Sequence, residues 1–340
     1  MIKYTTCNYI VHFKKSKYRY DTIWMQIHDL NIYFSIDKTR KTSILSLYMR
    51  TWYHDPVLLQ EVLERLPAQA CLVMDGTLGH GWHTLQILES RIQNPELKIL
   101  WVDRDGAMMT KAQERLAEYV SQMKYFRGSY ADFTSIMAVT WGKKFDAILL
   151  DIGVNMEHFK DGERGFSIKK DGPLDMRFDT SVGISAQERL RTCTTNQFHA
   201  MLTNFTDFSE KRIVKTSEEF FKTDRDFSTT FTLSARAKSI WMSDKVMAIF
   251  FQAIRIVVNG ELDEFQSFLD QFTNYLNPGG RCIVLTYHSI EDRMAKVAFK
   301  ALEDEGHVSI LTKHVIQPTR QEKQRNPAAR SAKMRVLERT

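Results

Sequence analysis

The sequence lacks the features of a membrane, secreted or repeat protein. No run of about 18 apolar residues occurs in its 340 residues, so we expect no membrane-spanning helix. The four cysteines are scattered and form no CxxC pair, which argues against a zinc site, against a disulfide framework and for a reducing compartment. No known repeat period occurs either, so a solenoid or a propeller is excluded.

No excess of one charge runs through the whole chain. Residues 1–50 hold nine Lys and Arg against three Asp, which accounts for the entire net charge of +6. The rest is neutral, although residues 311–340 carry eight basic residues and two Glu. Charge alone therefore gives a weak indication of a nucleic-acid partner. Residues 1–48 keep no period of 2 or 3.6, and we expect an extension that is disordered or not native, with translation starting at Met49.

The rest of the chain alternates between short apolar runs and amphipathic stretches, which predicts βαβ units and a parallel sheet. Its first half predicts strands at 70–75, 98–103, 123–127 and 145–151, and helices near 82–92, 105–120 and 131–139. Its second half predicts helices at 246–258, 261–276 and 289–305, a turn at 277–280, and strands at 281–287, 307–312 and 333–338. Polar residues separate the halves. We expect an α/β sheet domain formed by 49–156 and 246–340, with an inserted helical domain over 157–245.

The stretch MDGTLGHGWHT, residues 74–84, joins an expected strand to an expected helix. Its glycines allow a ligand to approach the backbone closely, and ligands of open α/β sheets bind at the carboxyl ends of strands. Asp103 ends the next strand, 22 residues after Gly81, where an acidic side chain can accept hydrogen bonds from ribose hydroxyls. Its alternative role is to cap the helix that begins DGAMM.

Neither GxGxxG nor GxxxxGK[ST] is present, so no turn is shaped for a pyrophosphate. A DGTxGxGxH turn, with acidic ends to the second and fourth strands, better suits S-adenosylmethionine. That cofactor has ribose hydroxyls, an adenine and a charged amino-acid end, but no phosphate. Asp151 ends the fourth strand, and it could hold the cofactor ammonium, face the substrate or cap the following loop.

Eight specific motifs follow one another along the chain: DGTLGHGWHT, WVDRD, FDAILLDIGVN, ERGFSIKKDGPLDMRFD, QAIRIVVNGELDEF, LNPGGR, YHSIEDR and NPAARSAKMRVLER. Together they closely resemble the RsmH (MraW) family, which uses S-adenosylmethionine to methylate the N4 atom of a cytosine in 16S ribosomal RNA. The resemblance covers residues 53–340. It implies a class I (Rossmann-like) methyltransferase domain, with a mostly parallel seven-stranded sheet and a helical insertion that recognises the substrate.

The resemblance also implies a set of cofactor contacts. Tyr130 stands where the family has Phe and keeps a ring beside the adenine, and His158 replaces Gln and keeps a polar group. Asp75 and Gly79 of the glycine-rich turn belong to the expected set as well. The remaining expected contacts are Gly81, Trp82, His83, Asp103 and Asp151.

Trp82 departs from the family, which has a second glycine there. An indole at this position would project where the backbone should touch the methionine end of the cofactor. Trp101 also replaces a residue that is often small, and only 15 of the 340 residues are glycine, fewer than the usual ~7%. One hypothesis covers these facts: a UGA codon read here as Trp but as Gly in the source organism. The alternatives are a reshaped or an inactive cofactor site.

Methyl transfer to the cytosine amine requires an acceptor for the proton that the amine loses. The amine is a poor nucleophile, so its alignment with the methyl group and an acceptor placed where charge develops supply much of the rate. The candidate groups are Asp151, Asn155, His288 and Ser289. His288 equally suits a structural histidine at a strand end. We expect no metal.

The resemblance implies small-subunit ribosomal RNA, or the assembling small subunit, as the partner, in the cytoplasm or alternatively in the mitochondrial matrix. A homodimer is a further expectation. Basic residues around the ERGFS motif are candidates for RNA contacts, with a solvated loop as the alternative. These candidates are Arg164, Lys169, Lys170 and Arg177.

Two other functions stay open. A non-catalytic ribosome-assembly factor could bind ribosomal RNA on the same fold, with Trp82 blocking the cofactor. A small-molecule or DNA amino-methyltransferase is a third hypothesis. DNA enzymes of that class usually carry [DNS]PP[YF] after the fourth strand, and DIGV at 151–154 argues against DNA.

Overall fold

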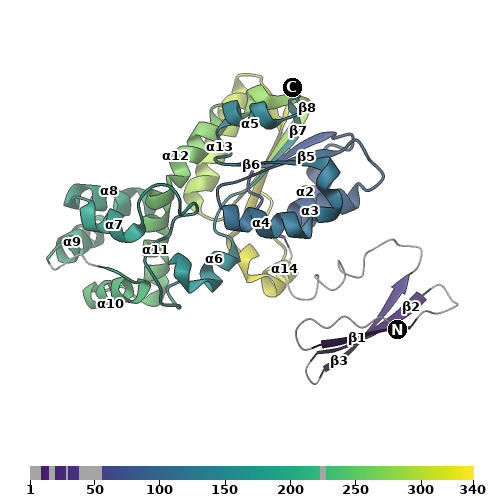
Figure 1. Ribbon diagram of the computed structural model, residues 1–340. Helices are drawn as coiled ribbons and strands as arrows, with labels where there is room; N and C mark the ends of the chain where they lie inside the picture. Colours follow the sequence, from purple (N-terminus) through teal and green to yellow (C-terminus); the bar gives the residue numbers. More distant parts are fainter. Residues whose placement is uncertain (1–8, 15–19, 28–29, 38–55, 223–226) are drawn as a thin grey trace. The chain divides into compact units, whose positions relative to one another are not determined.

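The computed structural model describes residues 9–14, 20–27, 30–37, 56–222 and 227–340 (Figure 1). The chain forms two units, Met1–Asp55 and Pro56–Thr340.

The first unit contains an antiparallel sheet where the sequence predicted an irregular extension. Its strands are β1 (Tyr9–Lys14), β2 (Tyr20–Ile27) and β3 (Leu30–Asp37), paired in that order. The β-branched and aromatic residues of these segments favour extended backbone, which explains the difference. The other residues of the predicted extension, Met49 included, lie outside the described residues, and whether the extension is native stays a prediction.

The second unit contains a seven-stranded sheet in the order β6-β5-β4-β7-β8-β10-β9. Only β10 runs antiparallel to its neighbours, which confirms the predicted mostly parallel sheet of the class I methyltransferase fold. The strands are β4 (Leu72–Asp75), β5 (Lys98–Asp103), β6 (Met123–Arg127), β7 (Phe145–Asp151), β8 (Leu276–Thr286), β9 (Val308–Ile310) and β10 (Lys333–Arg339).

The strands were predicted well, except at residues 277–280. The expected turn there lies inside β8, because Leu276 pairs with Phe145 and Arg281 with Ala147. The intervening residues bulge out of the ladder, and Gly279 takes the positive φ of 74° that such a bulge requires.

Helices cover both faces of this sheet (Figure 1). Because neighbouring residues of a strand point to opposite faces, Val73 of β4 joins one apolar cluster, whereas Leu72 and Met74 join the other. The first face carries α2 (Leu59–Arg65), α3 (Trp82–Ser90) and α4 (Gly106–Arg115), with η1 (Ala117–Gln122), α14 (Arg320–Arg325) and η4 (Pro327–Ser331) beside them. The second face carries α5 (Phe133–Val139), α12 (Glu261–Leu269), η3 (Phe272–Tyr275) and α13 (Ser289–Asp304).

Helices also form most of the segment between β7 and α12, as the sequence predicted. They are α6 (Met156–Lys160), η2 (Gly162–Arg164), α7 (Ala186–Thr192), α8 (Thr195–Phe205), α9 (Glu210–Phe220), α10 (Thr230–Ile240) and α11 (Asp244–Asn259). Figure 1 shows α7–α10 gathered around α11, away from the sheet. They enclose a third apolar cluster, in which the rings of Phe198, Phe220 and Phe250 are in contact. The exact boundaries 157 and 245 of an independent domain stay a prediction.

The unit Pro56–Thr340 holds its own apolar clusters and should fold without the extension. A chain that starts at Met49 should melt within about 2 °C of the full chain, measured by calorimetry. As a positive control, Phe272→Ala removes a fully buried ring and should cost about 3–5 kcal/mol. A fall in melting temperature on truncation as large as that of the control would contradict the prediction.

Candidate active site

The glycine-rich turn after β4 lies at the carboxyl edge of the sheet, between the ends of β5 and β7. Hydrogen bonds tie it to β7, because Gly76 donates its N–H to the Leu149 carbonyl at 2.9 Å and Thr77 Oγ1 accepts the Asp151 N–H at 2.6 Å. A Cβ atom on Gly76 would lie 2.3 Å from the Leu150 side chain. Glycine is therefore required for this close packing.

Asp103 ends β5 and holds the other side of the turn. Its Oδ2 accepts the Gly79 N–H and its Oδ1 accepts the Asp105 N–H, both at 2.8 Å. Each oxygen keeps a lone pair, and the predicted contact with ribose hydroxyls stays a prediction. Burial raises the pKa of Asp103 to about 6. The alternative role is filled by its neighbour, because Asp105 Oδ1 accepts the first N–H groups of α4.

Asp75 stabilises the turn from beneath. It is 2% exposed, its Oδ2 accepts the Thr84 hydroxyl at 2.7 Å, and its Oδ1 accepts the Thr77 N–H at 3.3 Å. Burial raises the pKa of this carboxyl. These bonds join the end of β4 to the first turn of α3, and a direct contact with a cofactor stays a prediction.

Asp151 ends β7 on the far side of the turn, and two side chains lie against its carboxylate. The Tyr287 hydroxyl donates to Asp151 Oδ1 at 2.6 Å, and His83 Nδ1 lies 3.6 Å from Oδ2. His83 is oriented by Nε2, which donates to the Val57 carbonyl at 3.0 Å. Burial raises the pKa of Asp151, and its side chain stays 24% exposed. The site thus presents an accessible carboxylate of increased basicity.

Tyr287 was not among the site residues predicted from the sequence, although its position at the end of a predicted strand was a signal. It follows β8, which is the neighbour of β7, so its side chain reaches the end of β7. The motif YHSIEDR drew attention to His288 and Ser289 instead.

His288 caps α13. Its Nδ1 accepts the Glu291 N–H at 3.4 Å and its Nε2 lies 2.7 Å from Glu291 Oε1. Glu291 is buried and its Oε2 accepts the Tyr287 N–H at 3.1 Å. His288 therefore has a structural role as the cap of α13, next to the strand end that carries Tyr287, and its catalytic role stays a prediction. Ser289 is exposed at the first position of α13, and its catalytic role stays a prediction.

Asn155 links the loop after β7 to the glycine-rich turn. Its Oδ1 accepts the Glu157 N–H at the start of α6, and its Nδ2 donates to His80 Nδ1 at 3.1 Å. Burial, together with the nearby charge of Arg115, lowers the pKa of His80 to about 4. The imidazole is therefore neutral at pH 7, and Nε2 carries its proton.

His158 belongs to a buried ionic network beneath the same loop. Its Nε2 donates to Asp105 Oδ2 at 2.8 Å, and Arg164 Nη1 lies 2.9 Å from the same oxygen. Phe166 and Phe178 lie against the imidazole ring. Although burial acts to raise it, the bonds from His158 and Arg164 hold the pKa of Asp105 down at about 2. His158 Nδ1 has no hydrogen-bond partner among the described residues, so a cofactor contact there stays a prediction.

The four predicted RNA contacts differ in accessibility. Arg164 is largely committed to the fold, because Nη2 also donates to the carbonyls of Arg177 and Phe178. Arg177 forms a two-bond ion pair with Asp175. Lys169 and Lys170 are exposed.

Tyr130 and Trp82 are the two aromatic residues of the predicted set. Tyr130 is 7% exposed and packs edge-to-face on Phe268 of α12, with ring centroids 5.8 Å apart. Trp82 begins α3, packs against the first apolar cluster, and lies 4.1 Å beneath the guanidinium of Arg115. Arg115 also donates to the His80 carbonyl. The indole is thus supported by α4, and whether it obstructs a cofactor stays a prediction.

The profile of the MraW methylase family matches residues 51–340. The chain is similar to proteins named Ribosomal RNA small subunit methyltransferase H. The one from Kosmotoga olearia is 34% identical, over 84% of this chain and 97% of its own. Those from Thermotoga neapolitana and Trichormus variabilis are 32% and 34% identical, over 85% and 88% of this chain and 96% of their own.

Solved structures resemble the chain only distantly. An rRNA methylase from Streptococcus thermophilus has a TM-score of 0.35 at 10% identity, covering 88% of this chain and 98% of its own. A SAM-dependent O-methyltransferase from Thermotoga maritima has a TM-score of 0.39 at 8% identity, covering 93% and 76%. The strand order, rather than these low scores, establishes the fold.

The Asp105 network should stabilise the fold in a pH-dependent way. Asp105→Asn keeps the helix cap but leaves Arg164 without its buried partner, so it should cost about 3 kcal/mol at pH 7. The folded pKa lies below the unfolded value of 3.8, so this stability is complete above about pH 4 and is lost as the pH falls through about 2.

Urea unfolding of both proteins at several pH values measures this difference. Asp132→Asn is the matched control, because Asp132 also caps a helix but is exposed and has no ion pair among the described residues. The prediction would be contradicted if both substitutions lowered the free energy of unfolding equally. It would also be contradicted if the loss caused by Asp105→Asn did not shrink towards pH 2.

Proposed function

The chain belongs to the MraW methylase family, and we propose that it methylates small-subunit ribosomal RNA with S-adenosylmethionine, at the N4 atom of a cytidine. The observation that carries this proposal is the turn after β4, which is bonded to Asp103 on one side and to the end of β7, where Asp151 lies, on the other. One carboxylate is available for ribose hydroxyls and the other for the reacting amine.

The residues at the carboxyl edge fit the cofactor. Asp103 would hold the ribose, the backbone of Gly79 and Gly81, with φ of 50° and 73°, would lie along the cofactor, and Tyr130 would lie near the adenine. When bound, the cofactor supplies an electrophilic methyl group on a sulfonium. The rest of the chemistry is alignment and proton removal, which this chain's own residues provide.

Asp151 is the proposed proton acceptor. As the N4–methyl bond forms and the sulfur–methyl bond breaks, the amine becomes acidic and loses one proton. An aligned carboxylate can accept its hydrogen bond and then the proton, and the raised pKa of Asp151 suits it to this role. Tyr287 holds the carboxylate in one orientation, so little reorganisation is needed during the step.

The substrate side of the site lies towards the helical segment. A cytidine must leave its stack to reach the turn, and exposed cations and rings can hold the flanking RNA. Lys169 and Lys170 are exposed there, and Phe231, which is 47% exposed, is joined to the same loop by its N–H bond to Asp171. These residues are the proposed RNA contacts of the loop.

Trp82 is the observation that favours a second candidate function, that of a non-catalytic ribosome-assembly factor that binds ribosomal RNA. In that case the indole would fill the space of the methionine end, and the cofactor would not bind. Measurement of cofactor binding separates the two candidates directly.

Asp103→Ala should abolish detectable binding of S-adenosylmethionine. It removes two charge-assisted hydrogen bonds worth roughly 1.5–3 kcal/mol each, so the affinity should fall by more than about 100-fold in calorimetry. In the unchanged protein, affinity should rise as the pH passes upward through about 6, where Asp103 ionises.

Asp146→Ala is the matched control for this experiment. Asp146 also accepts two backbone N–H groups, those of Cys71 and Leu72, but it begins β7 at the opposite edge of the sheet. It should lower stability and leave the affinity within about threefold of the original. Equal losses of affinity for the two variants would refute the ribose assignment.

Asp151→Asn should lower the rate of methyl transfer by about 100-fold or more, and Tyr287→Phe should lower it to a smaller extent. Tyr125→Phe, which removes an exposed hydroxyl, should have no effect. Mass spectrometry of nucleosides from digested small-subunit RNA should identify N4-methylcytidine. A product methylated on a ring carbon, or unchanged rates for Asp151→Asn, would argue against this chemistry.

A further inference from the structure

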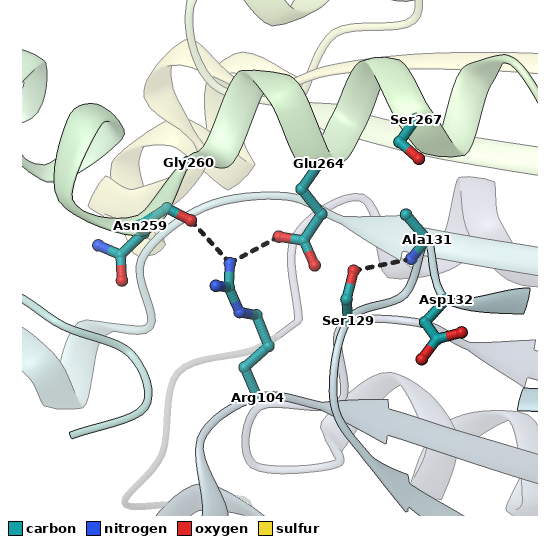
Figure 2. A pocket seen from close by; sticks show the side chains of 8 residues that line it. All are labelled: Arg104, Ser129, Ala131, Asp132, Asn259, Gly260, Glu264 and Ser267. Atoms are coloured by element: carbon teal, nitrogen blue, oxygen red, sulfur yellow. Dashed lines mark hydrogen bonds and ion pairs between the residues drawn. The ribbon is translucent and has the colours of Figure 1, made fainter. Parts of the chain in front are cut away.

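A pocket of about 370 Å³ lies at the carboxyl edge of the sheet, beside the residues of the proposed reaction (Figure 2). Arg104 follows β5, Ser129 and Asp132 follow β6, and Glu264 and Ser267 of α12 form the opposite wall. Its volume lies at the low end of the range for small-molecule sites. It is large enough for a nucleobase.

Glu264 places an unpaired acceptor in this pocket. One of its oxygens, Oε2, is held by Arg104 at 2.8 Å, and its side chain is only 10% exposed. The other, Oε1, is buried and has no hydrogen-bond partner among the described residues. Figure 2 shows this carboxylate facing Arg104 and Ser129. Buried acceptors are nearly always paired, so a ligand donor is expected here.

Arg104 fixes the position of this acceptor. Its Nη1 donates both to Glu264 and to the Asn259 carbonyl at 2.9 Å, which ties the loop after β5 to the junction of α11 and α12 (Figure 2). Burial raises the pKa of Glu264, whereas the Arg104 charge and the Ser129 side chain act to lower it, and the 2.8 Å ion pair with Arg104 favours a carboxylate. An ionised carboxylate only accepts hydrogen bonds. The missing partner is therefore an N–H or O–H group.

The order of the strands indicates which part of a ligand would reach Glu264. In the sheet, β5 lies between β6 and β4, and β4 is followed by β7. A nucleoside with its ribose on Asp103, which ends β5, and its amino-acid end towards β4 and β7 must extend its base towards β6. The pocket lies on that side, between Arg104, which directly follows Asp103, and Ser129.

We propose that Glu264 reads the base of the cofactor, with Oε1 accepting the exocyclic amine of a 6-aminopurine. This assignment rests on the proposed function, because it takes the ribose to be held by Asp103. A 6-oxopurine would turn a carbonyl oxygen towards the same carboxylate oxygen, and two acceptors repel. Glu264 is then a specificity-determining residue, and Arg104 is a positioning residue that holds it.

The experiment is calorimetry of S-adenosylhomocysteine and S-inosylhomocysteine binding to the full chain. The unchanged protein should bind the adenosine compound about 30-fold more tightly, as expected for one charge-assisted hydrogen bond. Glu264→Gln should abolish or reverse this preference, because the amide oxygen keeps Arg104 in place and the amide NH2, now at the position of Oε1, donates to a 6-oxopurine and not to an amine. A melting curve checks that the variant is folded.

Asp263→Asn is the matched control, because Asp263 is exposed on the same turn of α12 and loses the same charge. Its preference for adenosine should equal that of the unchanged protein. Equal binding of both compounds by the unchanged protein, or an undiminished preference in Glu264→Gln, would overturn the role of Glu264 alone. Binding of neither compound by the unchanged protein would overturn the proposed function, and this inference with it.

Discussion

The bond from the Gly79 N–H to Asp103 is the constraint on which the proposed site depends. It fixes the turn after β4 against the end of β5, and the bond from the Asp151 N–H to Thr77 fixes the same turn against β7. The two carboxylates are therefore spaced by hydrogen bonds and by the parallel sheet, not by long side chains. Burial raises the pKa of both Asp103 and Asp151, so the fold accepts a desolvation penalty where carboxylates are needed.

The Asp105 network connects this edge of the sheet to the helical segment. Asp105 caps α4 with one oxygen, and with the other it binds His158 of α6 and Arg164 of η2. Arg164 in turn holds the carbonyls of Arg177 and Phe178 in the loop that follows. A single buried carboxylate thus joins the cofactor edge to the loop that is proposed to meet RNA. Removal of one member would leave charges buried without partners, at a large cost in stability.

The sheet could be predicted because its strands are buried on both faces and read as apolar runs, as at 98–103 and 145–151. Asp103 and Asp151 could be predicted because they end such runs. Glu264 could not, because its partner Arg104 lies more than a hundred positions away and nothing in the sequence pairs them, whereas Tyr287 could be placed near Asp151 only with β8 known to lie beside β7. Residues 277–280 were misplaced for a related reason: NPGG has turn chemistry, but pairing of β8 with β7 on both sides converts it into a bulge.

The surroundings of the two unusual tryptophans, Trp82 and Trp101, bear on the recoding hypothesis. Trp101 is 1% exposed, and its indole N–H has no partner among the described residues, which costs about 1–3 kcal/mol. Packing of the buried ring stabilises the fold by about 3–5 kcal/mol, which outweighs the missing hydrogen bond and favours tryptophan in this core. Trp82 gains a cation–π contact with Arg115 instead. Burial therefore favours a native tryptophan at position 101, whereas the half-buried Trp82 gives no comparable indication. The two positions differ in one respect. Trp82, at the start of α3, adjoins the turn that a cofactor must approach, whereas Trp101 lies in the core.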